Sequence, residues 1–383
     1  MEKFICPRCH NDNPRFIGYR NGKPYCRLCL SFQGKEAIHN HEIKKNLRLC
    51  LSYPLSDKQQ DVSDKVMSLL MKGKNVLIHA VTGAGKTELV YASMEYFLKK
   101  GLHVGFSTPR KDVVIDLAPR IKEAFPDADV ISVYGEHTSK LEGDIIVLTT
   151  HQLYRYPDYF DLLILDEIDA FPYHGNELLH SFFSRSVKQN YVLLSATPSK
   201  NDIEDIKNDN GEIVELFERY HHAPLPVPSF EKAIFFSQEL ACLKLLRKFQ
   251  QQNKPVFIFT PTIEEGKRLY RFLSIAIKNG AFVSSKEEAR RLDIERFKDG
   301  ELSYLVTTSI LERGVTVRNL QVIVFDSDHP IYNSATLVQI AGRVGRKMDA
   351  KGGEVIFLGK ERNHEIDEAI YEIERYNHKA HLL

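Results

Sequence analysis

One stretch constrains the fold of this chain more than any other, namely residues 76–91, VLIHAVTGAGKTELVY. Its apolar run at residues 76–80 predicts a buried strand of a parallel sheet, and the sequence from Glu88 onward predicts a helix. Between the two, Gly83 and Gly85 allow the backbone to turn so that successive N–H groups face one point. A strand, a glycine loop and a helix in this order predict a phosphate-binding loop, to which the helix adds its positive dipole end.

Two side chains suit this loop to a nucleotide. Lys86 supplies a compact cation for the β and γ phosphates, and Thr87 offers a hydroxyl to Mg²⁺. Ala80 stands where the usual pattern has its first glycine. A glycine turn beside a surface lysine is the alternative, which the downstream motifs disfavour. The predicted nucleotide contacts of the loop are Thr82, Gly83, Ala84, Gly85, Lys86 and Thr87.

Length and charge set broad limits. The 383 residues suffice for two or three domains, and 52 Lys and Arg against 51 Asp and Glu say nothing about a polyanionic partner. Residues 1–50 are the basic part, with ten Lys and Arg against four Asp and Glu. The first residues lack an apolar signal region, and no run approaches the ~18 apolar residues of a membrane span. We expect a cytoplasmic protein, with peripheral attachment to a membrane left open.

The N-terminal segment contains two C-x2-C pairs, formed by Cys6, Cys9, Cys26 and Cys29. This spacing predicts a zinc ribbon over residues 1–40, because four thiolates around Zn²⁺ stabilise a segment too short for a core of its own. Redox dithiols or disulfides are the alternative, but a redox motif needs only one pair. His10 is a further possible ligand that we expect to be a solvated neighbour. Arginines, lysines and aromatic residues alternate in the ribbon, which is typical of a nucleic-acid-binding surface or of a plain solvated one.

The remaining chain predicts an α/β protein. Residues 35–54 read as a helical connector, and Ser56 or Asp57 caps the apolar helix that follows. Helical stretches then alternate with short apolar strands, which predicts parallel sheets covered on both faces. The predicted strands are residues 104–108, 130–134, 145–149, 162–166 and 191–195 in the first alternation, and residues near 256–260, 303–307, 321–325 and 354–358 in the second. The proline-rich residues 221–228 predict a linker, and residues 361–383 a closing helix. The predicted domains are the ribbon at 1–40, a first sheet domain at 41–222 and a second at 223–383. Two single cysteines, Cys50 and Cys242, are expected to be packing residues.

Adjacent carboxylates end one of the predicted strands. The run at residues 162–169, LLILDEID, places Asp166 and Glu167 at the carboxyl end of a buried strand, where ligands bind in parallel sheets. Asp166 is expected to hold Mg²⁺ through water, and Glu167 to polarise the water that attacks the γ phosphate. An acidic helix cap is the alternative, which the upstream phosphate loop makes less attractive.

Two further stretches fit the same chemistry. Residues 339–346, QIAGRVGR, present Gln339, Arg343 and Arg346 in the second predicted domain. Guanidinium groups suit the charge that develops in phosphoryl transfer, so we expect both arginines to reach the phosphates of the nucleotide. Ser195 and Thr197 follow another strand of the first domain and are expected to relay the nucleotide state.

Together these stretches resemble the superfamily 2 helicases and translocases over about residues 55–360. The resemblance implies two RecA-like domains with ATP between them, nucleic-acid-stimulated hydrolysis, and a nucleotide contact by Gln59. A further family motif matches residues 307–316 less closely, because Thr316 stands where many relatives have an acid. The resemblance also implies nucleic-acid contacts, for which ordinary loop capping is the alternative, at Thr108, Arg110, Thr150, His151, Thr260 and Thr308. Four nearby aromatics are expected to pack in the core and not to stack on bases: Tyr154, Tyr156, Tyr159 and Phe160.

A narrower likeness rests on the ribbon, the loop at residues 80–87 and the stretches at 169–172 and 310–316. These resemble the ComFA family of late-competence ATPases, and the chain is more distantly similar to the primosomal helicase PriA. The ComFA likeness implies ATP-driven movement of single-stranded DNA into the cytoplasm, with other competence proteins at the inner face of the membrane as partners. Two other functions stay open, a DEAD-type RNA helicase and a non-motor adaptor that ATP switches.

Overall fold

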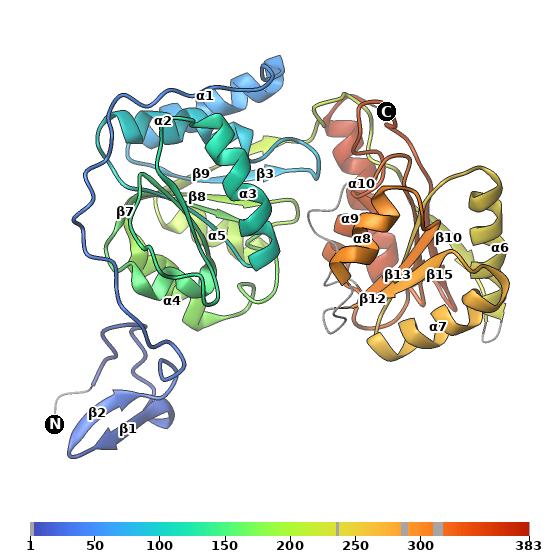
Figure 1. Ribbon diagram of the computed structural model, residues 1–383, viewed down its shortest axis with the longest axis horizontal. Helices are drawn as coiled ribbons and strands as arrows, with labels where there is room; N and C mark the ends of the chain where they lie inside the picture. Colours follow the sequence, from blue (N-terminus) through green and yellow to red (C-terminus); the bar gives the residue numbers. More distant parts are fainter. Residues whose placement is uncertain (1–3, 235–236, 285–289, 309–316, 383) are drawn as a thin grey trace. The chain divides into compact units, whose positions relative to one another are not determined.

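The computed structural model describes residues 4–234, 237–284, 290–308 and 317–382. Contacts divide the chain into two compact units, the first formed by Met1–Ala80 and Lys86–Leu216, the second by Val81–Gly85 and Phe217–Leu383. Each unit contains one parallel sheet with helices on both of its faces (Figure 1). The predicted α/β class, with two RecA-like domains after a small ribbon, is confirmed.

The ribbon folds as a short hairpin. A 3-10 turn, η1 (Pro14–Phe16), precedes β1 (Ile17–Arg20) and β2 (Lys23–Cys26), which pair antiparallel. Asn21 and Gly22 connect the strands with φ values of 50° and 76°. Two consecutive left-handed residues make the tight turn whose twist matches a hairpin, and Asn-Gly is the pair best suited to it.

The connector after the ribbon corrects one prediction, because residues 35–54 contain no helix. Several backbone N–H groups along this segment bond to acceptors elsewhere in the first unit. The N–H of Ile38 donates to Glu142 Oε1 at 2.8 Å, and that of Lys44 to Asp144 Oδ1 at 3.1 Å. Since the segment has no continuous apolar stripe to bury, these side-chain acceptors hold it extended against the unit.

The first unit has a seven-stranded sheet in the order β5-β6-β4-β7-β8-β3-β9, and all its pairs are parallel. The predicted strands are all present, and an unpredicted one, β9, closes the edge beside β3. Its strands are β3 (Asn75–Ala80), β4 (Val104–Thr108), β5 (Val130–Val133), β6 (Ile145–Thr149), β7 (Phe160–Asp166), β8 (Val187–Ser195) and β9 (Gly211–Leu216).

Helix starts in this unit follow side-chain chemistry. In α1 (Asp57–Met71), Ser56 is the cap and exchanges hydrogen bonds with Gln59. The helix expected from Glu88 instead opens with a 3-10 turn, η2 (Glu88–Val90), and Thr87 before it provides no side-chain cap. The α-helix begins only at Tyr91. The remaining helices are α2 (Tyr91–Lys99), α3 (Lys111–Ala124), η3 (Thr150–Arg155), α4 (Glu177–Ser186) and α5 (Lys200–Asn208).

The second unit has a six-stranded parallel sheet in the order β10-β15-β14-β11-β13-β12, in which β10 and β12 were not predicted. Its strands are β10 (Ser229–Lys232), β11 (Val256–Thr260), β12 (Gly280–Val283), β13 (Tyr304–Thr308), β14 (Gln321–Phe325) and β15 (Val355–Gly359). Its helices are α6 (Ser237–Gln251), α7 (Ile263–Ala276), α8 (Arg290–Lys298), α9 (Ser334–Ala341) and α10 (His364–Lys379). The closing helix is therefore confirmed. Helix α10 holds the proline-rich linker through Asn377. The Asn377 side chain accepts the N–H of Leu225 at 2.7 Å and donates to the Leu225 carbonyl at 2.9 Å.

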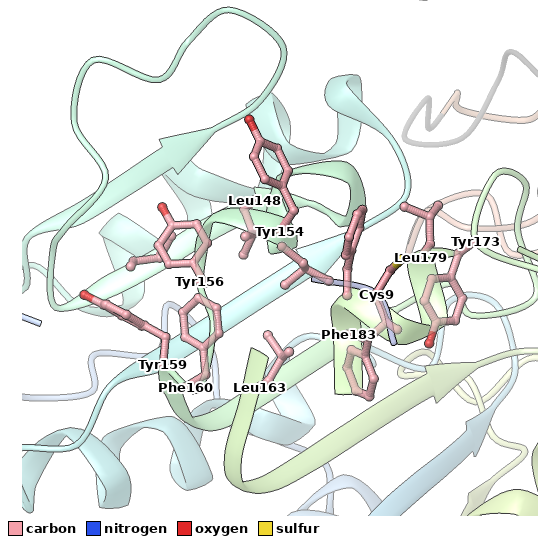
Figure 2. Packing of buried hydrophobic residues seen from close by; sticks show 14 of the residues in the cluster. Cys9, Leu148, Tyr154, Tyr156, Tyr159, Phe160, Leu163, Tyr173, Leu179 and Phe183 are labelled. Atoms are coloured by element: carbon pink, nitrogen blue, oxygen red, sulfur yellow. The ribbon is translucent and has the colours of Figure 1, made fainter. Parts of the chain in front are cut away.

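Aromatic side chains fill the core of the first unit (Figure 2). The four predicted packing aromatics, residues 154, 156, 159 and 160, are all buried there. The same cluster takes in the four ribbon cysteines, so the ribbon and the sheet share apolar contacts. Of the two single cysteines, Cys242 is buried as expected, whereas Cys50 is exposed and that prediction is wrong. No helix among the described residues has the length and apolar character needed to cross a bilayer.

Candidate active site and metal centre

The phosphate loop has the backbone that its glycines predict. Gly83 and Gly85 take φ values of +86° and +77°, which are accessible to glycine at little steric cost. The Nζ of Lys86 donates to the carbonyl of Ala80 at 2.9 Å, so the ammonium group lies at the end of β3, where the loop begins. The loop therefore fits a phosphate group in both backbone and charge.

Sheet order places three motifs at one edge. Strand β8 lies between β3, which leads into the loop, and β7, which ends at Asp166. The registers are aligned, since His79 of β3 pairs with Ser195 and Asp166 of β7 pairs with Leu194. Because the strands are parallel, their carboxyl ends meet at the same edge, which is where ligands bind in such sheets. The end of β3, the two acids and Ser195 are thus brought together at one edge of the first unit's sheet.

The two acids have different environments. Burial and the neighbouring Glu167 carboxylate raise the pKa of Asp166 to about 7, while the Lys86 ammonium acts in the opposite direction. One oxygen of Asp166 accepts the backbone N–H of Glu167 at 2.9 Å, and Glu167 has a φ of 58° that turns the chain sharply at the strand end. A bound Mg²⁺ would favour the ionised carboxylate and polarise the phosphate oxygens. Both carboxylates suit that ion, because hard cations prefer oxygen ligands.

A third acid connects this strand end with the next one. Asp169 accepts a hydrogen bond from the Ser195 hydroxyl at 3.0 Å and another from the Thr197 hydroxyl at 2.9 Å. Ser195 in turn accepts the backbone N–H of Thr197 at 3.0 Å. Hydrogen bonds to a carboxylate are about twice as strong as neutral ones, so Asp169 holds Ser195 and Thr197 close to the strand end that carries the acids. The sequence motif contained Asp169 without indicating this role.

The predicted arginines lie in the loop that follows α9. Arg343 is buried, with its guanidinium 5.8 Å from the ring centre of Phe259, and the Nε of Arg346 donates to the carbonyl of Gly342 at 3.1 Å. Gln339 is half-buried on the last turn of α9. Residues 81–85 count with this unit by their contacts, and the Thr82 hydroxyl donates to the same Gly342 carbonyl at 3.2 Å.

Gln59, the remaining predicted nucleotide contact, lies in the first turn of α1 and is buried. Its side-chain oxygen accepts the backbone N–H of Ser56 at 2.9 Å, so this atom completes the helix cap. The role in nucleotide binding stays a prediction. Of the further family motif at residues 307–316, residues 309–316 lie outside the described residues.

The four ribbon cysteines form a candidate metal centre. Their Sγ atoms all lie within 4.8 Å of one another, with Cys6 to Cys29 at 3.8 Å and Cys9 to Cys26 at 3.7 Å. A tetrahedron with Zn–S bonds of about 2.3 Å has edges of about 3.8 Å, which agrees with these separations. A disulfide would need about 2.05 Å, and all four cysteines are free. The cluster is therefore compatible with zinc, and His10 is exposed outside it.

The thiols of this centre differ in their pKa shifts, since burial raises the pKa of Cys9 to about 11 and also raises that of Cys29, whereas the pKa of Cys6 is lowered. Burial disfavours the Cys6 thiolate, but hydrogen bonds from the backbone of Arg8 and Cys9 outweigh it and lower the pKa of Cys6. Asn11 reaches the Sγ of Cys26 at 3.7 Å and restrains a second ligand. Neighbouring donors of this kind fix the orientation of metal ligands.

The predicted nucleic-acid residues are mostly inside the protein. Thr108, Thr150 and Thr260 are fully buried, and the Thr260 hydroxyl donates to the carbonyl of Thr307 at 3.2 Å. Thr308 is buried at the end of β13, and Arg110 is half-buried at the start of α3. Any contact by these threonines would therefore use backbone N–H groups and not hydroxyls.

His151 differs, because it touches the segment that leaves the ribbon. It is half-buried, and its ring stacks on Phe32 with centres 6.3 Å apart and planes 14° apart. Burial lowers the pKa of His151, so the ring is neutral near pH 7. Phe32 also packs edge-on against Phe182, at 4.9 Å. The ribbon itself carries a hollow of about 810 Å³ whose lining includes Arg8, Arg20, Lys23 and Tyr25.

Comparison with known proteins identifies the family. Residues 60–206 match the model for the DEAD/DEAH box helicase, and residues 237–348 match that for the helicase conserved C-terminal domain. The competence protein ComFA of Bacillus subtilis is 34% identical, over 93% of this chain and 82% of the relative. ComFA of Streptococcus pneumoniae is also 34% identical, over 99% of this chain and 92% of the relative. The chain belongs to the ComFA family.

This membership confirms the predicted enzyme class, a superfamily 2 nucleic-acid-dependent ATPase that uses ATP and Mg²⁺. Solved structures agree on the fold. Saccharomyces cerevisiae Dbp5 bound to RNA and ADP BeF3 matches with a TM-score of 0.63 at 15% identity, covering 84% of this chain and 91% of Dbp5. The DUF1998 helicase MrfA bound to DNA matches with a TM-score of 0.60 at 15% identity, covering 92% of this chain and 55% of MrfA.

Proposed function

We propose that this protein is an ATP-driven translocase of single-stranded DNA that serves DNA uptake during competence. The observation that carries the proposal is the 34% identity to two competence proteins along almost the whole chain. Membership of the helicase superfamily alone does not favour DNA over RNA. The ribbon supports a nucleic-acid partner, because Arg20, Lys23 and the exposed Tyr19 combine positive charge with an aromatic surface.

In the proposed cycle, residues 82–87 bind the phosphates of ATP, and Asp166 holds Mg²⁺. Glu167 positions and deprotonates the attacking water, while Arg343 and Arg346 stabilise the charge on the transferred phosphoryl group. The Asp169 bonds to Ser195 and Thr197 pass the nucleotide state to the rest of the first unit. Each turnover would advance the strand by one step. The DNA is delivered to the cytoplasm, where other competence proteins at the membrane are the partners.

The test compares ATPase stimulation by single-stranded DNA with stimulation by RNA of the same length. We expect DNA to stimulate more strongly, and translocation to be visible as displacement of a protein block from the strand. Stronger stimulation by RNA would favour an RNA helicase, and hydrolysis indifferent to both would favour a switched adaptor.

The second arm is Glu167→Gln, which keeps size and hydrogen bonding but removes the base. We expect ATP binding to persist and turnover to fall by about 10²- to 10⁴-fold. Glu177→Gln is the matched control, since Glu177 is an exposed acid in the first turn of α4. Near-normal turnover by Glu167→Gln would contradict the assigned base.

A further inference from the structure

The chain entering the second unit contains an arginine whose guanidinium holds the backbone of the arginine loop at residues 342–346. Arg219 is 1% exposed, although it carries a full charge. Its Nη1 donates to the carbonyls of Val344 at 2.8 Å and Gly345 at 3.1 Å, and its Nη2 donates to that of Gly342 at 3.3 Å. Three carbonyls of one short loop thus converge on one planar cation.

This contact is an unusual choice for packing alone. Burial, together with the charge of Arg346, lowers the pKa of Arg219 to about 9, so the side chain remains protonated at neutral pH. Among the described residues, the guanidinium donates hydrogen bonds to backbone carbonyls and to no carboxylate. A buried cation loses favourable hydration free energy on burial, a cost that an apolar side chain of similar size does not have. What the guanidinium adds is a rigid fork of donors that fixes the positions of its acceptors.

The loop is held at further points by the same segment. The hydroxyl of Tyr220 donates to the carbonyl of Arg346 at 2.8 Å. Gly345 has a φ of +70°, and a Cβ built on it would lie 2.2 Å from the carbonyl oxygen of Lys351, so only glycine fits the turn. The carbonyls of residues 342, 344, 345 and 346 are therefore all engaged from outside the loop.

One acceptor links Arg219 directly to a predicted catalytic side chain. The Gly342 carbonyl receives both Arg219 Nη2 at 3.3 Å and Arg346 Nε at 3.1 Å. A shift of Arg219 moves this carbonyl, and with it the bond that orients the Arg346 guanidinium. Arg343 lies between two of the three acceptor residues, 342 and 344, so its backbone is fixed by the same contacts.

We propose that Arg219 is a positioning residue for ATP hydrolysis, which holds the loop so that Arg343 and Arg346 point at the transferred phosphoryl group. This rests on the proposed function of those two arginines. Arg219 acts through the loop and not on the nucleotide, so its removal should impair turnover more than ATP binding. A displacement of about 1 Å in a catalytic group is enough to slow a reaction by about 10²-fold.

The test measures kcat and KM for ATP in the DNA-stimulated reaction of the full chain. Arg219→Met should lower kcat by about 10- to 100-fold and change KM far less. Arg219→Lys keeps the charge but not the fork, so it should recover only part of kcat. The matched control is Arg318→Met, because Arg318 forms an exposed ion pair with Asp349 at 2.7 Å, and its kcat should equal that of the wild type.

Double variants separate this inference from the function on which it rests. Adding Arg219→Met to a variant that already lacks both arginines, Arg343→Met with Arg346→Met, should not slow hydrolysis further, because the groups that Arg219 positions are already absent. If Arg346→Met and Arg343→Met hydrolyse ATP normally, the proposed roles of those arginines fail. If they are inactive while folded Arg219→Met has a wild-type kcat, only the positioning role fails. Should Arg219→Met not fold, a wild-type kcat for Arg219→Lys would equally overturn it.

Discussion

A single buried arginine, Arg155, allows a test of the contact between the segment that leaves the ribbon and the rest of the first unit. Arg155 ends η3, and its Nη1 donates to the carbonyl of Lys35 at 2.8 Å, in the segment that leaves the ribbon. Its Nε donates to Gln152 Oε1 at 2.6 Å, and its own carbonyl accepts the N–H of Ala37 at 2.8 Å. A Cβ on Gly34 would lie 2.4 Å from Nη1, so the chain passes close to the guanidinium.

Arg155→Met keeps most of the side-chain volume and removes the donors. A hydrogen bond from a charged group contributes about 1.5–3 kcal/mol, and two are lost. Because the substitution also removes the desolvation penalty of a buried cation, part of this loss is offset. The net decrease in the free energy of unfolding is about 2 kcal/mol. In a unit of this size, about 1 kcal/mol lowers the melting temperature by about 2–4 °C. We therefore expect the melting transition of the first unit to fall by about 4–8 °C.

The assay is thermal melting combined with hydrogen exchange at residues 34–38, where Arg155→Met should speed exchange. Arg185→Met is the matched control, because Arg185 reaches the same segment through a single contact of 3.5 Å to the half-exposed Glu36. A pair of that kind contributes about 1 kcal/mol or less. Equal melting temperatures for the two variants, or unchanged exchange at residues 34–38 in Arg155→Met, would refute the account of this contact.

Three further predictions concern the network, the metal and the linker. Ser195→Ala should reduce the stimulation of hydrolysis by nucleic acid while ATP binding persists, because Asp169 loses the hydroxyl donor of Ser195 and keeps that of Thr197. A rate assay with and without DNA measures the stimulation, and an unchanged value would contradict the prediction. Purified protein should contain zinc, and Cys9→Ser should lower both the zinc content and the stability of residues 4–30. Elemental analysis measures the zinc and limited proteolysis the stability, and a metal-free but folded ribbon would exclude the site. Asn377→Ala leaves the buried N–H and carbonyl of Leu225 unpaired, which should destabilise the second unit by about 2–4 kcal/mol. A melting curve indistinguishable from that of the wild type would contradict this prediction and show that water replaces both bonds.

Motifs whose chemistry depends on neighbouring residues were predictable in detail. The glycines of the phosphate loop have the left-handed φ values that its turn requires, and the thiol spacing of the ribbon gives four sulfur atoms at distances suited to zinc. Apolar runs predicted the central strands within a few residues. The same reasoning failed at residues 35–54, because a polar segment without an apolar stripe takes its conformation from acceptors such as Glu142, which lie about a hundred residues away in the chain.

Local sequence therefore determined the family, the parallel sheets, the nucleotide loop and the thiolate cluster, since each depends on residue types at short, fixed spacings. Only the tertiary structure decided which motifs are neighbours. Strand order sets β8 between β3 and β7 and so brings Ser195 to the strand ends beside Asp166. Burial decided that the side chains of Thr108, Thr150 and Thr260 lie inside the protein. Arg219 had no sequence signal, because its three acceptors are carbonyls of residues more than a hundred positions away, and backbone carbonyls are present at every residue whatever its side chain.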